Sequence, residues 1–288
     1  MQLTGTGIWS AQLRFGDPAA VRDASAELEN LGYSALWIPD IGGDVFGSLR
    51  TMLDATTSIV AATGILNLWM HSAEEAAAGF GELSEQHPDR VLLGIGVSHA
   101  PLVDAGSPGR YRAPLDAMRS YLDGLDAATP PLPAGARVLA ALGPRMLELA
   151  RHRSAGAHPY LVNPAHTQLA REVVGKAALL APEQAVVLET DPARARALAR
   201  GHLSIYLNLP NYTRNLRRIG FDDDDFADGG TDRLVDAIVA WGHEDAVRAR
   251  VQEHRDAGAD HVAVQVITDD FSAMPLEAWR RLAPALAA

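Results

Sequence analysis

The sequence predicts an α/β protein whose parallel strands close into a (β/α)8 barrel. Short apolar runs alternate with longer amphipathic segments along the 288 residues, and about eight such runs can be separated. This alternation indicates repeated βα units and a parallel sheet, and eight units indicate a closed barrel. Because such barrels reach about 250 residues in one domain, we expect residues 1–288 to form a single barrel domain. An open doubly wound sheet is the alternative, but no complete G-x-G-x-x-G motif opens a helix after the first predicted strand.

Each predicted strand is a short run rich in apolar and β-branched residues. Such runs are typical of parallel strands that helices bury on both faces. The eight predicted strands are residues 6–13, 35–40, 64–70, 90–97, 137–142, 158–163, 179–188 and 260–267.

The segments between these strands carry the start and stop signals of helices. Asp17 can cap a helix that has Pro18 at its first position, and Gly32 is placed to end it. Ser72 and Glu75 have the spacing of a capping box. The predicted helices are residues 17–33, 48–63, 72–88, 111–127, 143–156, 164–175, 191–220 with a break or bend near Pro210, 233–242 and 244–258. The Pro/Gly-rich stretch 128–136 and the acidic stretch 221–232 are expected to be surface loops.

The composition of the chain limits the kinds of binding partner that we expect. The formal net charge of −11 argues against nucleic acid or an anionic membrane as the main partner. The absence of cysteine excludes disulfides and thiolate chemistry. The N-terminal residues lack the regions of a signal peptide, and no apolar run approaches the ~20 residues of a membrane span. We therefore expect a cytoplasmic protein that acts on a small molecule.

The residues at the predicted strand ends favour ligand binding over hydrolysis. In barrels of this kind the active site lies at the C-terminal ends of the strands. No H-x-H, H-E-x-x-H or G-x-S-x-G spacing occurs there, so we expect neither a metal site nor a serine nucleophile. The strand-end residues are Trp9, Ser10, Asp40, Asn67, Trp69, His71, Gly96, Ser98, His99, Gly143, Pro144, Arg145, Tyr160, Asn163, Glu189, Thr190 and Gln265.

Small residues at two strand ends favour a large planar cofactor. Gly94, Gly96 and Gly143 would let a ring or a phosphate approach the backbone. Pro144 begins a helix whose free N–H groups favour an anion, to which Arg145 could add charge. An ordinary strand-to-helix turn explains each glycine by itself equally well, but two such turns after consecutive strands favour the cofactor.

Four sequence blocks, in their order and spacing, resemble the luciferase-like monooxygenase superfamily in the branch that uses the deazaflavin coenzyme F420. These blocks are residues 32–40, 62–101, 138–167 and 250–267. The resemblance implies a luciferase-like (β/α)8 barrel, a homodimer, and a deazaflavin or flavin at the strand C-termini. It also implies a bulge in the third strand, often with a non-proline cis peptide, which maps near Leu66, Asn67 and Leu68.

The same resemblance assigns further site residues. Cofactor contacts map onto Gly96, Ser98 and His99 after the fourth strand and onto Leu142, Gly143 and Pro144 after the fifth. The acidic residue that ends the second strand maps onto Asp40. Sugar-phosphate dehydrogenases of this branch follow that residue with a histidine acid/base, whereas Ile41 stands here. We therefore hypothesise that Asp40 and His99 carry the catalytic role.

The leading hypothesis is an F420-dependent oxidoreductase that transfers a hydride between the deazaflavin and a small organic substrate. Trp9, Trp69 and Ile41 could supply an apolar wall beside the ring. The alternatives are an FMN-dependent monooxygenase and a non-catalytic cofactor-binding barrel. We expect residues 208–226 to cover part of the barrel mouth, where Tyr206, Asn211 and Tyr212 face either the substrate or a partner subunit.

Overall fold

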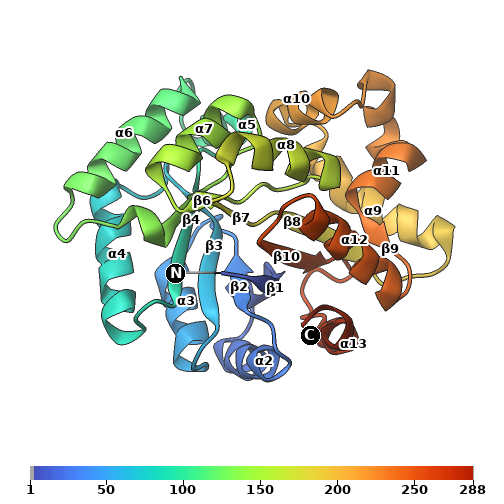
Figure 1. Ribbon diagram of the computed structural model, residues 1–288, viewed down its shortest axis with the longest axis horizontal. Helices are drawn as coiled ribbons and strands as arrows, with labels where there is room; N and C mark the ends of the chain where they lie inside the picture. Colours follow the sequence, from blue (N-terminus) through green and yellow to red (C-terminus); the bar gives the residue numbers. More distant parts are fainter. Residues whose placement is uncertain (1–2, 288) are drawn as a thin grey trace.

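Parallel strands form the centre of the molecule, and helices surround them (Figure 1). A computed structural model of the protein describes residues 3–287. Its sheet contains ten strands, paired in parallel in the order β7-β6-β5-β4-β3-β2-β1-β10-β8-β9. The strands are β1 (Gly5–Trp9), β2 (Ala35–Ile38), β3 (Val60–Asn67), β4 (Val91–Gly96), β5 (Arg137–Leu139), β6 (Gly156–Ala157), β7 (Leu179–Leu180), β8 (Glu183–Val187), β9 (Ala240–Trp241) and β10 (His261–Val266).

One continuous segment, residues 179–187, supplies β7 at one edge of this sheet and β8 next to the edge strand β9 on the other side. Its first part, β7, pairs with β6, and its second part, β8, pairs with β10. The backbone N–H of Glu183 also donates to the carbonyl oxygen of Pro159 at 2.8 Å, so the segment hydrogen-bonds on both sides. The predicted (β/α)8 barrel is thereby confirmed, with its seventh strand divided into β7 and β8.

Helices follow most of the strands, and their caps agree with the sequence. The Asp17 side chain accepts hydrogen bonds from the backbone of Ala19 and Ala20, and Ser72 and Glu75 form the predicted capping box. The α-helices are α1 (Gln12–Phe15), α2 (Pro18–Asn30), α3 (Val45–Asp54), α4 (Ala73–Gln86), α5 (Ala100–Gly106), α6 (Pro114–Ala127), α7 (Pro144–Arg153), α8 (Pro164–Val174), α9 (Pro192–Tyr206), α10 (Pro210–Arg218), α11 (Asp232–Ile238), α12 (Glu244–Asp256) and α13 (Leu276–Leu286). Two 3₁₀ helices are η1 (Ala134–Ala136) and η2 (Asp223–Gly229).

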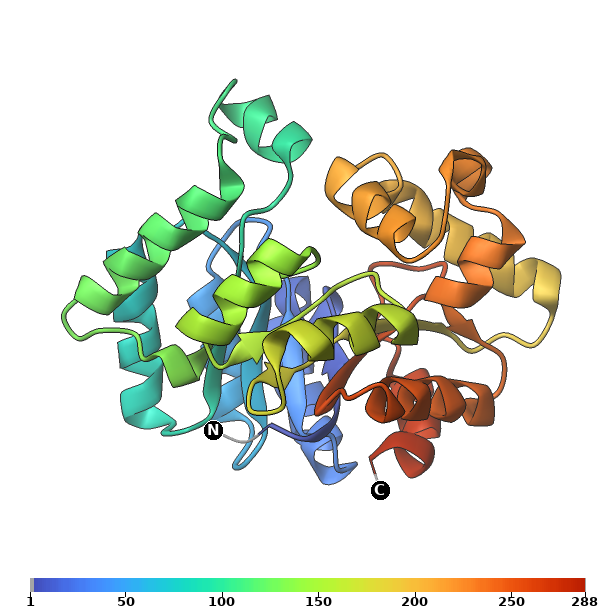
Figure 2. The ribbon, with the colours of Figure 1, turned by 45° about the horizontal axis from the view of Figure 1, so that its top comes forward.

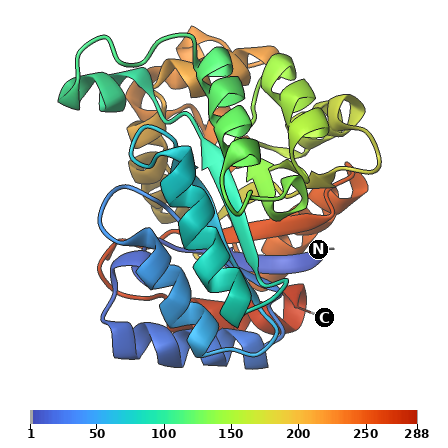
Figure 3. The ribbon, with the colours of Figure 1, turned by 90° about the vertical axis from the view of Figure 1, so that its left-hand side faces the viewer.

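The main core lies between the sheet and the helices outside it. Strands β2 and β4 are buried along their whole length, which explains their uninterrupted apolar runs. Helices α3 and α4 lie side by side against the sheet (Figure 3). None of the helices between residues 3 and 287 has the length and apolar character needed to cross a membrane.

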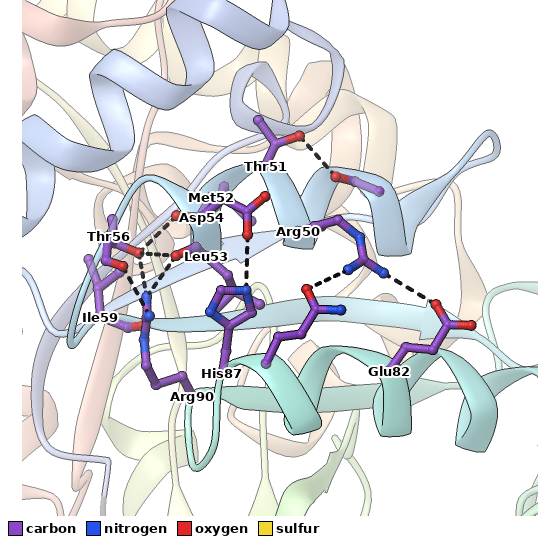
Figure 4. A network of polar contacts seen from close by, with 12 residues as sticks. Arg50, Thr51, Met52, Leu53, Asp54, Thr56, Ile59, Glu82, His87 and Arg90 are labelled. Carbon is purple, nitrogen blue, oxygen red and sulfur yellow. Dashed lines mark hydrogen bonds and ion pairs between the residues drawn. The ribbon is translucent and has the colours of Figure 1, made fainter.

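A polar network fixes the start of β3 and β4 beneath α3 and α4 (Figure 4). The Arg90 guanidinium donates to the carbonyl oxygens of Leu53, Thr56 and Ile59 at 3.0 to 3.3 Å. Beside it, His87 Nε2 lies 3.0 Å from an Asp54 carboxylate oxygen. These contacts lie at the end of the barrel opposite the strand C-termini, so they stabilise the fold without reaching the predicted site.

The largest departure from the sequence prediction is at the third strand. Strand β3 begins at Val60, four residues before the predicted start, and α3 ends at Asp54 rather than Thr63. The apolar residues 60–63 continue a helical spacing, but they pair with β2 and β4 on either side. Tertiary pairing therefore overrides the local pattern.

Several smaller elements also differ. Residues 158–163 are not a strand; the sixth strand is the short β6 just before them. The predicted helix 233–242 ends at Ile238 and continues as β9, and α13 was not predicted. The bend at Pro210 is confirmed, since α10 begins there. In the acidic stretch, Asp225 is buried and binds Arg233 and Thr231, whereas the prediction placed the whole run at the surface.

Candidate functional site

The C-terminal ends of β1 to β5 meet at one edge of the barrel, with α5 and α10 on this side (Figure 2). Strand β3 carries an irregularity there: its register with β4 shifts between Thr63 and Leu66, and the Gly64–Ile65 peptide is cis. The resemblance placed this feature near residues 66–68, so it lies slightly earlier than expected. Leu66 itself points into the main core and Leu68 is also buried, which leaves Asn67 as the partly exposed residue of that stretch.

Two glycines of β4 accommodate this irregular part of β3. A Cβ atom on Gly94 would lie 2.1 Å from the Thr63 carbonyl oxygen, and one on Gly96 would lie 2.5 Å from Ile65 Cγ1. Both glycines are buried. The space that the sequence analysis reserved for a ring beside them is therefore filled by β3, and their small size serves the packing of the two strands.

Asp40, just after β2, is the buried carboxylate of this edge. Its Oδ2 atom accepts a hydrogen bond from the backbone N–H of Asn67 at 3.0 Å and lies 3.0 Å from His71 Nε2. Its Oδ1 atom is buried and has no partner. The irregular end of β3 thus brings two sequence-predicted strand-end residues, Asn67 and His71, onto one carboxylate.

His99, the other residue to which a catalytic role was given, lies away from this carboxylate. No hydrogen bond or ion pair joins it to Asp40 within residues 3–287. It stands at the N-cap of α5, and its ring lies 5.0 Å from that of Tyr212. Burial lowers the pKa of His99 to about 4, so its ring is neutral near pH 7. The two predicted catalytic residues are therefore not hydrogen-bonded to each other in the described part of the chain.

Helix α10 covers the loop after β4. The Asn211 side-chain amide donates to the carbonyl oxygen of Ser98 at 3.3 Å and to the Tyr111 hydroxyl at 3.4 Å. Ser98 has a positive φ of 54°, which turns the chain into α5. Asn211 and Tyr212 therefore contact the site loop of their own chain.

An aromatic layer lies under α9 and α10. The Tyr160 hydroxyl hydrogen-bonds to Tyr206 and to Gln265, each at 2.8 Å, and its ring lies 5.4 Å from Trp9. The Trp9 indole N–H donates to the Gly64 carbonyl oxygen at 3.2 Å, so this layer reaches the irregular part of β3. Of the predicted apolar wall, Trp9 is buried here, whereas Ile41 is exposed.

Glu183 is a second buried carboxyl in this region, and the sequence analysis gave it no role. Its Oε2 atom accepts from the Leu161 backbone N–H at 3.1 Å, while Oε1 is buried without a partner. Burial raises the pKa of Glu183 to about 8, against the lowering effect of the Leu161 hydrogen bond. The side chain is therefore mainly protonated at neutral pH.

Two arginines lie at the start of α7. Gly143 is its N-cap and makes no side-chain cap, Pro144 follows, and Arg145 is exposed. The guanidinium of Arg218 on α10 approaches from above, 3.2 Å from the position of a Cβ atom on Gly143. Neither arginine forms an ion pair within residues 3–287, whereas the adjacent Arg217 binds Asp223.

Several buried polar atoms at this edge and just inside the barrel have no hydrogen-bond partner within residues 3–287. Buried polar groups normally find a hydrogen-bond partner, so a cluster without partners fits a site that a polar ligand completes. These atoms are Asp40 Oδ1, His99 Nδ1, His158 Nε2, His166 Nδ1 and Glu183 Oε1. No group of three or more potential metal-ligating side chains gathers anywhere in residues 3–287.

The partners that complete this arrangement were not predicted from the sequence. His71 was counted among the strand-end residues without a role, and Arg218 and Glu183 were not considered. Arg218 carries a usable signal, because it belongs to the segment expected to cover the barrel mouth. Glu183 lies inside a strand, and only the folded structure shows that its carboxyl group is buried with one oxygen unpartnered.

Comparison with known proteins supports the observed fold and identifies one family whose model matches most of the chain. The model of the family described as luciferase-like monooxygenase matches residues 3–261. No protein in a curated sequence set matches the chain.

Solved structures of the same fold include both deazaflavin and flavin enzymes. An F420-dependent secondary alcohol dehydrogenase in complex with an F420-acetone adduct has a TM-score of 0.75 at 12% identity, covering 98% of both chains. The coenzyme F420-dependent tetrahydromethanopterin reductase from Methanopyrus kandleri has a TM-score of 0.75 at 17% identity over 98% of both chains. The oxygenating constituent of 3,6-diketocamphane monooxygenase from Pseudomonas putida, in complex with FMN, has a TM-score of 0.71 at 15% identity over 99% of both chains.

Proposed function

This chain belongs to the luciferase-like monooxygenase family, and on that premise we propose that it is an F420-dependent oxidoreductase. The reaction is hydride transfer between the deazaflavin and a small organic substrate. The bound deazaflavin supplies the hydride chemistry. The residues of this chain bind it, orient the substrate beside it and exclude water.

The observation that carries this proposal is the start of α7. Free backbone N–H groups at a helix start attract an anion, and the nearby guanidinium groups of Arg145 and Arg218 add charge-assisted hydrogen bonds. In a chain with a net charge of −11, two arginines without acidic partners at a ligand-binding edge favour a bound phosphate. Leu142, Gly143 and Pro144 would then hold the phosphate of the cofactor.

The ring would lie between this helix and β3. For that region we propose cofactor contacts from Asn67, Ser98 and His99 and from the main chain of Leu66, Leu68 and Gly96, since β3 fills the side-chain space of Gly96. The unpartnered atoms of Asp40 and His99 suit a ring system that carries both hydrogen-bond donors and acceptors.

We favour F420 over FMN because the two solved structures with a TM-score of 0.75 are both F420 enzymes. FMN also carries a phosphate and suits the same helix start, so it is the second candidate. In that case the enzyme is a monooxygenase that uses molecular oxygen.

Equilibrium binding of F420 to wild type, Arg218→Ala and Arg217→Ala tests the phosphate site. We expect Arg218→Ala to weaken binding by about tenfold, the usual effect of removing one charge-assisted hydrogen bond. Arg217→Ala is the matched control, because its guanidinium is already bound to Asp223. Equal affinity in all three proteins would contradict the proposed site.

A further inference from the structure

The pair formed by Asp40 and His71 has the geometry of a positioned proton carrier. Asp40 Oδ2 lies 3.0 Å from His71 Nε2 and also accepts the Asn67 N–H, while the Asp40 side chain is fully buried. Because Asp40 Oδ2 already accepts the Asn67 N–H, the contact favours the His71 tautomer in which Nε2 donates to this oxygen. In the neutral ring the other nitrogen, Nδ1, is then the hydrogen-bond acceptor.

The free nitrogen of His71 is available at the site. Its Nδ1 atom makes no hydrogen bond within residues 3–287 and is not among the buried atoms that lack a partner. The side chain is 19% exposed. The edge of the ring packs on Phe46, with the ring centroids 6.0 Å apart and the planes at 80°. The ring is therefore held by Asp40 and Phe46, with Nδ1 left open to a ligand.

Two exposed apolar side chains stand next to Asp40 and His71 in the chain, and the arginines around them already donate hydrogen bonds. Ile41 is 72% exposed and Met70 46% exposed, and the two lie on adjoining loops. The charged groups nearby already have partners: Glu75 accepts from Ser72 in the capping box, Arg14 donates to Gly42 and Ser48, and Arg110 donates to the Trp69 carbonyl oxygen at 2.7 Å. An uncharged organic molecule fits such a rim better than an anion does.

We propose that His71, positioned by Asp40, transfers the proton in this enzyme's reaction, and that the substrate is an uncharged organic molecule bearing a hydroxyl or carbonyl group. This rests on the oxidoreductase function proposed above. In the oxidative direction the hydroxyl proton passes to His71 Nδ1 and the O–H electrons form the C=O bond. The carbinol C–H bond breaks as a hydride, whose two electrons reduce an oxidised deazaflavin or flavin. The reverse direction protonates the carbonyl oxygen from Nδ1.

The chain offers a matched control for this pair. His87 Nε2 and Asp54 Oδ1 are also 3.0 Å apart, but they lie at the opposite end of the barrel (Figure 4). A histidine next to an aspartate is therefore present twice, once at the site and once away from it.

The first test needs neither cofactor nor turnover. Nitrogen-15 NMR of the full-length protein with labelled histidine rings reports which nitrogen carries the proton. We expect His71 to be protonated at Nε2 with Nδ1 as an acceptor, and Asp40→Asn to abolish this single tautomer while the His87 signals stay unchanged. A His71 ring protonated at Nδ1 alone, or an unchanged ring in Asp40→Asn, would overturn the proposed positioning.

The second test follows turnover of the enzyme loaded with whichever cofactor binds, using cyclohexanol and 2-octanol as probes and cyclohexanone for the reverse direction. We expect His71→Gln to lower kcat by at least about a hundredfold, the usual range for a lost general acid or base, with KM and cofactor Kd unchanged. Asp40→Asn should lower kcat less and His87→Gln not at all. A His71→Gln kcat within threefold of wild type overturns the role.

The outcomes separate this inference from the proposed function. If wild type binds neither F420 nor FMN, the oxidoreductase function fails, and the NMR result still decides the pair. If a cofactor binds but none of the uncharged alcohols or the ketone reacts, the substrate class inferred here is wrong while the cofactor proposal stands.

Discussion

The carbonyl oxygen of Thr63 occupies the place that a side chain on Gly94 would need. A Cβ atom there would lie 2.1 Å from that oxygen, far inside van der Waals contact. Because Thr63 is where β3 loses its regular register with β4, this close approach places the irregular strand at the candidate site. The shape of the site thus depends on a glycine whose missing side chain leaves room for β3.

Gly94→Ala should therefore destabilise the protein. One strand must move, and overpacking of this kind costs roughly 1–3 kcal/mol of unfolding free energy. Urea unfolding followed by circular dichroism measures the loss. Gly201→Ala in α9 is the control, because no atom lies within 4 Å of the added Cβ. It should gain about 0.5–1 kcal/mol, since alanine favours a helix interior. Equal stability of the two variants would contradict this packing.

Glu183 should make stability fall as the pH rises. Burial raises the pKa of its carboxyl to about 8, above the ordinary value of 4.5. Between these two pH values the folded state holds a proton that the unfolded state has lost, so the free energy of unfolding decreases by up to about 1.4 kcal/mol per pH unit. Glu183→Gln removes this group, and its stability relative to wild type should increase between pH 5 and pH 8. A difference that does not change with pH would contradict a raised pKa.

His254 should act in the opposite direction, at lower pH. Its ring bonds to Thr167 and Gln184 inside the protein, and burial lowers its pKa to about 3 from 6.5. The contribution of this group to the free energy of unfolding is complete above pH 6.5. It is lost as the pH falls toward 3, because the histidine of the unfolded chain takes up a proton at a higher pH than the histidine of the folded chain. His254→Gln should lose less stability than wild type between pH 7 and pH 5. His152→Gln, which changes an exposed histidine, should behave like wild type in the same urea titrations.

Asn211 should control the mobility of the loop after β4. The Asn211 side-chain amide donates hydrogen bonds to Ser98 and Tyr111, and these bonds connect α10 to this loop. Asn211→Ala removes both, so backbone amides of residues 98–113 should exchange with deuterium faster, while those of β4 should not change. Unchanged exchange in residues 98–113 would show that α10 does not hold the loop.

The barrel could be predicted from sequence because most strands are local apolar runs and several helices carry their own cap residues. Asp17, Ser72 and Pro210 are signals that a few neighbouring residues supply. The start of β3 could not be predicted in this way, since residues 60–63 have a helical spacing and only pairing with β2 and β4 makes them a strand. Strand β9 is two residues long, too short for any periodicity.

The site was predicted in part. Asp40, Asn67 and His71 were expected at strand ends. The Asn67 backbone N–H and the His71 ring both lie within hydrogen-bond distance of the Asp40 carboxylate. Which histidine meets Asp40 could not be predicted, because His71 is 31 residues away and its position depends on the irregular end of β3. Arg218 reaches the start of α7 only because α10 folds back over the barrel.

The central claim, a deazaflavin bound at the start of α7, is tested most directly by fluorescence titration of the full-length protein with F420 and, in parallel, with FMN. We expect saturable F420 binding that is tighter than FMN binding and weakens as salt is added, because arginines hold the phosphate. Tighter binding of FMN would move the enzyme to the flavin monooxygenases. Binding of neither cofactor would contradict the account.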